Sequence, residues 1–93
     1  MPRTVKTIAQ ELGVLDETQK KTLRIAIREL LNKREVEVLD ARLGLDRNLP
    51  RTLEQVGIMQ GITKERVRQI EAWALRRLRH PANRKRLMEF FTS

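Results

Sequence analysis

Apolar residues along this 93-residue chain recur at the three- and four-residue spacing of amphipathic helices, and no stretch shows the sustained alternation of a strand. Sparse glycines and prolines divide the pattern into segments with short connections. The sequence therefore predicts an all-α fold, a compact bundle of about five helices that forms a single domain over residues 1–93. The expected helices lie at 4–12, after Asp16, from Asn32 to Gly44, at 53–60, at 64–79, and near Phe90.

Capping residues predict where several of these helices begin and end. In a capping box, a Ser, Thr, Asp or Asn precedes a Glu or Gln by three positions, and the two side chains satisfy free backbone N–H groups. Gly61 permits the positive φ of a tight turn, and Pro81 disfavours helix in the residue before it. Thr63 is a further expected N-cap. The capping-box pairs are Asp16 with Gln19, Asn32 with Glu35, and Thr52 with Gln55.

Residues 52–81 have the arrangement of a helix-turn-helix: a short helix, a turn that contains glycine, and a long amphipathic helix. Ile62 in the turn is expected to fill the angle between the two helices. The long helix is expected to bury one side, with Glu71 at its edge in a structural ion pair with an arginine. The residues expected to be buried are Leu53, Val56 and Met59, with Ile58 beside them, in the short helix, and Val67, Ile70, Ala74 and Leu78 in the long one.

The exposed side of the long helix carries side chains that suit the major groove of DNA. Lys64, Glu65 and Gln69 lie near its N-terminus, and these residue types match guanine, the amine of cytosine, and adenine. Arg66 and Arg68 on the flanks are expected to hold phosphates, which set the position of a protein without selecting a sequence. An ordinary surface helix with many ion pairs has the same spacing, so the pattern alone leaves both interpretations open.

The distribution of charge bears on whether the long helix binds DNA or is an ordinary surface helix. The net charge is +8, and residues 64–93 contribute +6 of it, because nine basic residues stand there against three acidic ones. A basic face of this kind attracts a polyanion and releases counterions from DNA or RNA. A solvated helical surface is the alternative. The charge distribution favours a nucleic-acid partner.

Several other classes of protein are not expected. The chain has no Cys, which excludes disulfides, thiolate metal sites and Cys nucleophiles, and a single histidine, His80, does not make a zinc site. No apolar run approaches the ~20 residues of a membrane span, and the start does not resemble a signal peptide. We therefore expect a cytoplasmic protein that is not an enzyme, without cofactor, metal, membrane or small-molecule substrate.

The motifs LNKREVEVLDARLGL, TLEQVG and ERVRQIEAWALRRLRHP resemble the C-terminal promoter-binding region (region 4) of primary bacterial sigma factors. The resemblance covers roughly Leu31 to Leu87, so residues 32–93 are expected to be region 4-like, with 1–31 weakly matched. It implies sequence-specific binding of the −35 promoter element and docking on the β flap of RNA polymerase during transcription initiation.

The resemblance also implies roles for individual residues. Glu65 and Gln69 fall on positions that contact bases, as does Lys64, which stands where the family usually has Arg. Leu43 and Leu78 match positions that line the groove for the β flap. The residues on positions near the DNA backbone are Arg34, Arg42, Thr52, Leu53, Glu54, Arg66 and Arg68.

Two residues point to protein partners. Arg76 stands where activators commonly touch the family, and Trp73 departs from the family, which usually has Lys or another polar residue there. Trp73 is expected to be exposed, either flat over neighbouring side chains or as an anchor for a partner. The alternatives to a part of a sigma factor are a free-standing sigma-like regulator, with dimerisation through residues 1–31, and an interaction module bound by anti-sigma factors or activators.

Overall fold

The computed structural model describes residues 16–46 and 49–92, and in this part of the chain it has five α-helices and no strand. The all-α prediction is confirmed. The helix expected over 4–12 lies outside the described residues. The helices are α2 (Glu17–Leu30), α3 (Lys33–Leu43), α4 (Leu53–Gln60), α5 (Lys64–Arg79) and α6 (Pro81–Thr92).

The predicted helix caps are confirmed. At each of the three capping boxes, the side-chain oxygen of the N-cap residue accepts a hydrogen bond from the backbone N–H three residues later, at 2.7 Å for Asp16, 2.8 Å for Asn32 and 3.1 Å for Thr52. Gly44 and Gly61 follow α3 and α4 with φ of 68° and 69°, a left-handed conformation that suits glycine. Local sequence therefore sets most of the helix ends.

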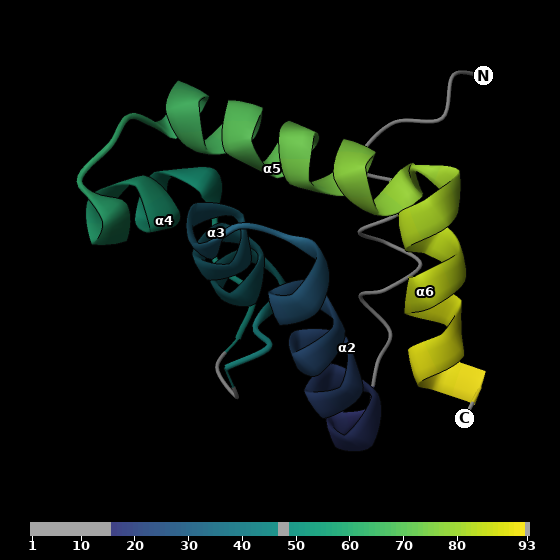
Figure 1. The fold of residues 1–93 in the computed structure, drawn as a ribbon. Helices are drawn as coiled ribbons and strands as arrows, with labels where there is room; N and C mark the ends of the chain where they lie inside the picture. Colours follow the sequence, from purple (N-terminus) through teal and green to yellow (C-terminus); the bar gives the residue numbers. More distant parts are fainter. Residues whose placement is uncertain (1–15, 47–48, 93) are drawn as a thin grey trace, which may run out of the picture.

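Helix α5 is the longest element and organises the others (Figure 1). Helices α3 and α4 pack against it, and α6 turns away from its C-terminal end, where His80 and Pro81 stop the helix as predicted. Helix α2 packs against α6 and α3. This arrangement leaves one side of α5 facing away from the bundle.

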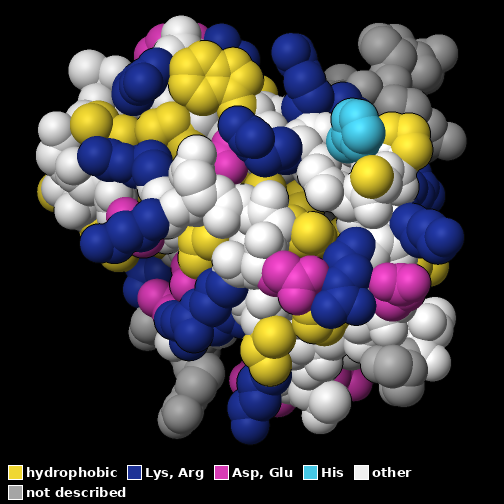
Figure 2. All heavy atoms as spheres, in the orientation of Figure 1, with side chains coloured by type: hydrophobic (Ala, Val, Ile, Leu, Met, Phe, Trp, Pro, Cys, Tyr) yellow, Lys and Arg dark blue, Asp and Glu magenta, His cyan; other side chains and the backbone are white. Residues whose placement is uncertain are grey.

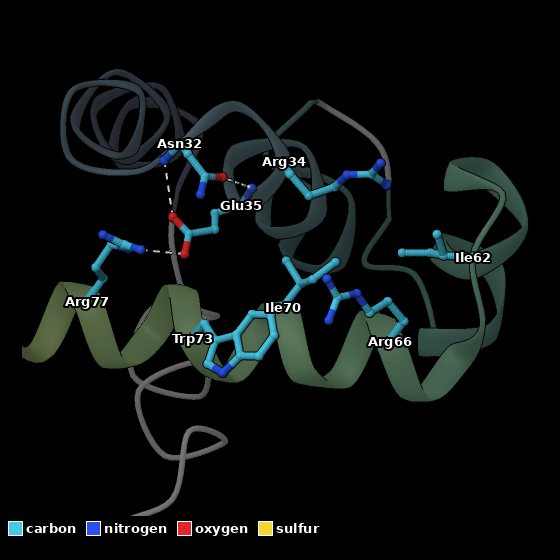
Figure 3. A pocket seen from close by; sticks show the side chains of 8 residues that line it. All are labelled: Asn32, Arg34, Glu35, Ile62, Arg66, Ile70, Trp73 and Arg77. Atoms are coloured by element: carbon cyan, nitrogen blue, oxygen red, sulfur yellow. Dashed lines mark hydrogen bonds and ion pairs between the residues drawn. The ribbon is translucent and has the colours of Figure 1, made fainter.

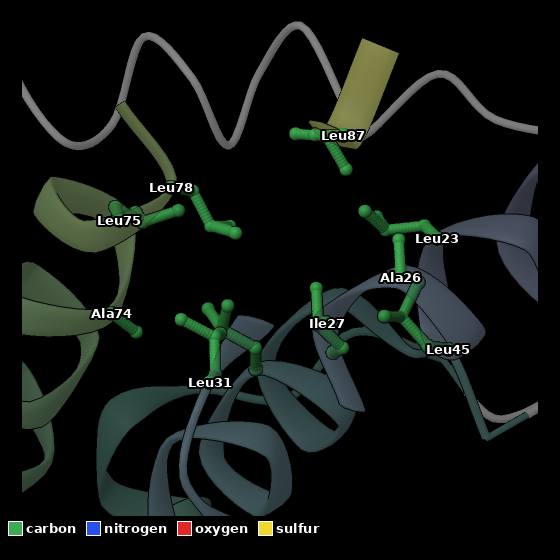
Figure 4. Packing of buried hydrophobic residues seen from close by; sticks show 10 residues of the cluster. Leu23, Ala26, Ile27, Leu31, Leu45, Ala74, Leu75, Leu78 and Leu87 are labelled. Atoms are coloured by element: carbon green, nitrogen blue, oxygen red, sulfur yellow. The ribbon is translucent and has the colours of Figure 1, made fainter. Parts of the chain in front are cut away.

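Two apolar clusters hold the helices together. The larger one joins α2, α3, α5 and α6 with aliphatic side chains (Figure 4), and partly buried Phe90 and Phe91 pack against it. The smaller one joins α3, α4 and α5, with Leu53 and Ile62 packed against it. The expected buried side of α5 is confirmed. The larger cluster consists of Leu23, Ala26, Ile27, Leu31, Leu39, Leu45, Ala74, Leu75, Leu78 and Leu87. The smaller cluster consists of Val38, Ala41, Val56, Val67 and Ile70.

The expected buried face of α4 is wrong at Met59 and at Ile58. Met59 is 53% exposed, and Ile58 beside it is also exposed. The helix instead turns Val56 and Gly57 inward. A side chain at Gly57 does not fit, because a Cβ there would lie 2.7 Å from the carbonyl oxygen of Ile62. Glycine thus lets the turn approach α4 closely on the side of the helix that is buried.

Candidate nucleic-acid interface

Helices α4 and α5 form the predicted helix-turn-helix. The backbone N–H of Ile62 donates to the carbonyl of Gly57 at 2.9 Å, which closes the turn, and the Thr63 hydroxyl accepts from the N–H of Arg66 at 3.0 Å, which caps α5. The Ile62 side chain packs against the smaller cluster, as expected. These contacts fix the position of the N-terminal half of α5 relative to α4.

The expected base-contacting residues lie on the outer side of this half of α5. Lys64 and Glu65 are exposed, and Gln69 is half-buried. Arg66 and Arg68 are exposed on either side of them. The helix thus presents donors, acceptors and positive charge on one accessible face, which is the arrangement that a recognition helix needs.

Glu65 is held by Arg68 one turn along the helix. The Arg68 guanidinium donates to both carboxylate oxygens of Glu65, with Nε at 2.8 and 2.9 Å and Nη2 at 2.5 Å from Oε1. These hydrogen bonds lower the pKa of Glu65 and raise that of Arg68. Glu65 is therefore a carboxylate, which accepts and does not donate.

The side-chain amide of Gln69 is hydrogen-bonded to Arg66, three positions earlier on the helix. Arg66 Nη1 donates to Oε1 of Gln69 at 3.3 Å, and the Arg66 guanidinium carbon lies 5.0 Å from the centre of the Trp73 ring. Trp73 itself is 44% exposed. It was expected either to lie over neighbouring side chains or to anchor a partner, and its ring stacks with Arg66 in this structure.

The residues expected to contact the DNA backbone differ in how accessible their side chains are. Arg34 on α3 is exposed, and its Nη1 donates to Oε1 of Gln60 at 3.0 Å. Arg42 is engaged inside the protein: its Nε lies 3.1 Å from Oε1 of Glu71, and its Nη1 donates to the Arg51 carbonyl at 2.6 Å. The structural ion pair predicted for Glu71 is confirmed. Arg42 therefore supports the fold directly.

The start of α4 offers backbone donors. Thr52 and Glu54 are exposed and Leu53 is half-buried. The capping box uses the N–H groups of Gln55 and Thr52. The N–H groups of Leu53 and Glu54 have no partner within the helix, as in every first helical turn, so they can donate to an anion.

A hollow of about 310 Å³ lies between the start of α3 and the middle of α5 (Figure 3). Glu35 lies at its inner wall with only 4% of its side chain exposed, and it accepts from Arg77 Nε at 3.2 Å and from the N–H of Asn32 at 3.1 Å. The sequence identified Glu35 as a capping residue but not as a buried partner of Arg77, 42 positions away. This pair fixes α3 to the side of α5 that carries Trp73.

The expected protein-contacting residues differ in accessibility. Arg76 is exposed and Leu43 is half-buried. Leu78 is 2% exposed and lies in the larger cluster, so it does not line an open groove in this structure. Its burial follows from its helical position on the same side as Ala74 and Val67, which face the core.

Figure 2 shows basic side chains spread over this face of the molecule, with acidic side chains among them. Among the described residues, no group of three or more His, Cys, Asp or Glu is placed to hold a metal ion. None of the helices in the described ranges is both long and apolar enough to cross a membrane. Over the whole sequence, lysine and arginine outnumber aspartate and glutamate by 20 to 12.

Comparisons with known proteins agree with this geometry. The family described as "Sigma-70, region 4" matches residues 29–80. The chain is 56% identical over 62 residues to the RNA polymerase sigma factor SigA of a Bacillus species, which covers 67% of this chain and 16% of that protein. It is 55% identical over 62 residues to the SigA protein of Listeria monocytogenes serovar 1/2a, covering 67% of this chain and 17% of that protein.

The matched range includes α3, the helix-turn-helix and the end of α5. The chain spans about a sixth of the length of these curated relatives. More than half of its residues fall within the matched family region. The chain belongs to the sigma-70 region 4 family.

Proposed function

We propose that this chain recognises the −35 element of bacterial promoters, with α5 in the major groove. Lys64, Glu65 and Gln69 contact base edges there, because a lysine donates to guanine, a carboxylate accepts from the cytosine amine, and a glutamine pairs with adenine. The observation that carries this proposal is the accessible N-terminal half of α5, on which Lys64 and Glu65 are exposed and Gln69 is half-buried.

Phosphate contacts hold the domain in position. We assign them to Arg34, Arg66 and Arg68 and to the backbone N–H groups at the start of α4. We do not assign one to Arg42, because its guanidinium is bound to the buried Glu71 and to a backbone carbonyl, whereas the ion pair of Arg68 with Glu65 is exposed to solvent. A domain that makes a handful of such contacts binds DNA weakly by itself, and its affinity falls steeply with salt.

A direct test compares a duplex that contains a −35-type hexamer with a scrambled duplex, by fluorescence anisotropy at about 150 mM salt. We expect Glu65→Ala and Gln69→Ala to bring the two affinities together, because a good bidentate base contact discriminates by about 1–3 kcal/mol. Arg84→Ala on α6 is the control, since it removes an exposed charge and leaves α5 intact. If both α5 variants keep the discrimination of the wild type, these side chains do not select the sequence.

The relatives are named as RNA polymerase sigma factors, and we propose that this chain also docks on the polymerase, on the flap of its β subunit, within the bacterial cytoplasm. Leu43 is the partly accessible member of the expected groove, while Leu78 is buried in the larger cluster. Leu43→Asp is expected to abolish capture by the flap, whereas Met88→Asp, on an exposed part of α6, is expected to leave it unchanged. Equal capture by both variants would remove Leu43 from the interface.

A regulatory partner is a second candidate function, supported by the exposure of Arg76 beside the half-exposed ring of Trp73. An activator or anti-sigma factor with an acidic surface would meet these residues on the C-terminal half of α5, away from the base-contacting residues. Charge reversal by Arg76→Glu is expected to prevent such binding while sequence discrimination on DNA stays intact. Co-precipitation with a purified acidic regulator measures this, and binding that survives the reversal argues against this surface.

A further inference from the structure

Trp73 lies on the same flank of α5 as Arg66, seven positions earlier, so the two side chains stack along the helix. The Arg66 guanidinium is 5.0 Å from the centre of the ring, within the range of a cation–π contact. Figure 3 shows both side chains at the edge of the hollow between α3 and α5, with Ile70 between them on the helix. The ring thus restricts the positions that the arginine can take.

Arg66 in turn holds Gln69 through the 3.3 Å hydrogen bond to Oε1. A glutamine that pairs with adenine must present its oxygen as an acceptor and its nitrogen as a donor in one plane. A carbonyl oxygen has two lone pairs, so Oε1 can accept from Arg66 and from adenine together, while the amide nitrogen stays free to donate. A restrained arginine therefore fixes the orientation that base contact requires.

We propose that Trp73 is a positioning residue for sequence recognition: it holds Arg66, and Arg66 orients the amide of Gln69 towards its base. The inference rests on the proposed function, because it presumes that Gln69 contacts a base. Trp73 is the one aromatic residue on α5. The polar side chains that contact bases do not themselves need it, and this proposal gives it a role.

Glu65 provides an internal comparison. Its carboxylate is held by Arg68 through three hydrogen bonds, and neither residue contacts Trp73 in the contacts described for α5. Loss of the Trp73 ring should therefore weaken discrimination at the base pair contacted by Gln69 and leave discrimination at the base pair contacted by Glu65 unchanged. A general loss of stability or of charge would affect both base pairs alike.

The experiment measures affinities for the hexamer duplex and for duplexes with single base-pair substitutions. Gln69→Ala and Glu65→Ala first identify the base pair that each residue contacts. Trp73→Ala is then expected to lower discrimination at the Gln69 base pair by about two- to fivefold, the value of an exposed cation–π contact. Trp73→Phe should restore part of it, and Gln69→Ala/Trp73→Ala should discriminate no worse there than Gln69→Ala alone.

A second readout needs no DNA. In the free protein, the side-chain amide signals of Gln69 in a ¹⁵N NMR spectrum should shift and sharpen in Trp73→Ala, because the amide becomes mobile. Met88→Ala, which truncates another exposed apolar side chain on α6, should leave them unchanged. Unchanged Gln69 signals in Trp73→Ala overturn the proposed chain of contacts.

The outcomes separate the two proposals. If the wild type discriminates and Trp73→Ala loses discrimination at the Gln69 base pair alone, the inference holds. If Trp73→Ala keeps full discrimination, or loses it equally at both base pairs, the inference is wrong and the proposed function stands. If the wild type binds hexamer and scrambled duplexes equally, the proposed function fails, and the role of Trp73 in recognition fails with it.

Discussion

The pair formed by Arg42 and Glu71 allows the sharpest prediction about what holds the interface in place. The pair joins α3 to the recognition helix, with 3.1 Å between Nε and Oε1, and the Glu71 side chain is only 10% exposed. Arg42→Met removes the positive charge and leaves a carboxylate buried between two helices. The expected result is a large loss of stability.

The size of the loss follows from the burial of the pair. Removing one member of a buried ion pair lowers the stability by about 3–5 kcal/mol, because the remaining charge is buried without a partner in the low-dielectric protein interior. The Arg42 side chain keeps 27% of its exposure, so water reaches the pair. We therefore expect the lower end, about 3 kcal/mol, out of the roughly 5–14 kcal/mol available to a domain of this length.

Urea unfolding and a thermal melt, both followed by circular dichroism, measure this change. A loss of about 3 kcal/mol corresponds to a fall of roughly 12–24 °C in Tm for a domain of this size. The double variant Arg42→Met/Glu71→Leu is the control, because replacement of both charges by apolar groups is often neutral. A single variant that loses under about 1 kcal/mol, or a double variant no more stable than the single one, would refute the reasoning.

Three further predictions concern the turn, a buried carboxylate and a surface ion pair. Gly57→Ala should unfold or strongly destabilise the helix-turn-helix, because the new Cβ would lie 2.7 Å from the Ile62 carbonyl oxygen. Gly61→Ala has open space around the new Cβ but a φ of +69°, so in the same thermal melt it should lower the stability by only about 1 kcal/mol. Burial raises the pKa of Asp40 and outweighs the neighbouring Arg24, so the folded state binds a proton more tightly than the unfolded state. The stability that the Asp40 carboxyl contributes is present below its unfolded pKa and is lost as pH rises through its folded pKa. In urea titrations, the free energy of unfolding of Asp40→Asn relative to the wild type should therefore increase from acid to neutral pH. A difference that is constant with pH would contradict this prediction. Arg86→Ala should change the free energy of unfolding by under about 1 kcal/mol, because its partner Glu29 is on the surface; a larger loss would show that α6 depends on this contact.

Sequence alone predicted the parts of the fold that depend on local rules. The capping boxes at Asp16, Asn32 and Thr52 and the left-handed Gly61 are local, because each depends on residues within a few positions. The buried side of α5 followed from helical periodicity for the same reason. These features needed no knowledge of the neighbouring helices.

The features that were missed depend on tertiary contacts. Met59 and Ile58 were expected in the core, but α4 turns Val56 and Gly57 inward, where the turn approaches closely, and leaves both side chains exposed. The partner of Glu35 is Arg77, 42 positions away, and no local pattern joins them. Arg42 fell on a position expected near DNA, and only the packed structure shows that its guanidinium is bound to Glu71. The candidate site could thus be located on α5 from sequence, but its supporting contacts could not.

The central claim is that the outer face of α5 selects a promoter sequence. The most direct measurement titrates the wild-type chain with the −35-type hexamer and with six sets of duplexes, each substituted at one base pair, at about 150 mM salt. We expect affinity to fall by about 1–3 kcal/mol at the base pairs contacted by Lys64, Glu65 and Gln69. Equal affinity for the hexamer, for every substituted duplex and for scrambled DNA would contradict the account.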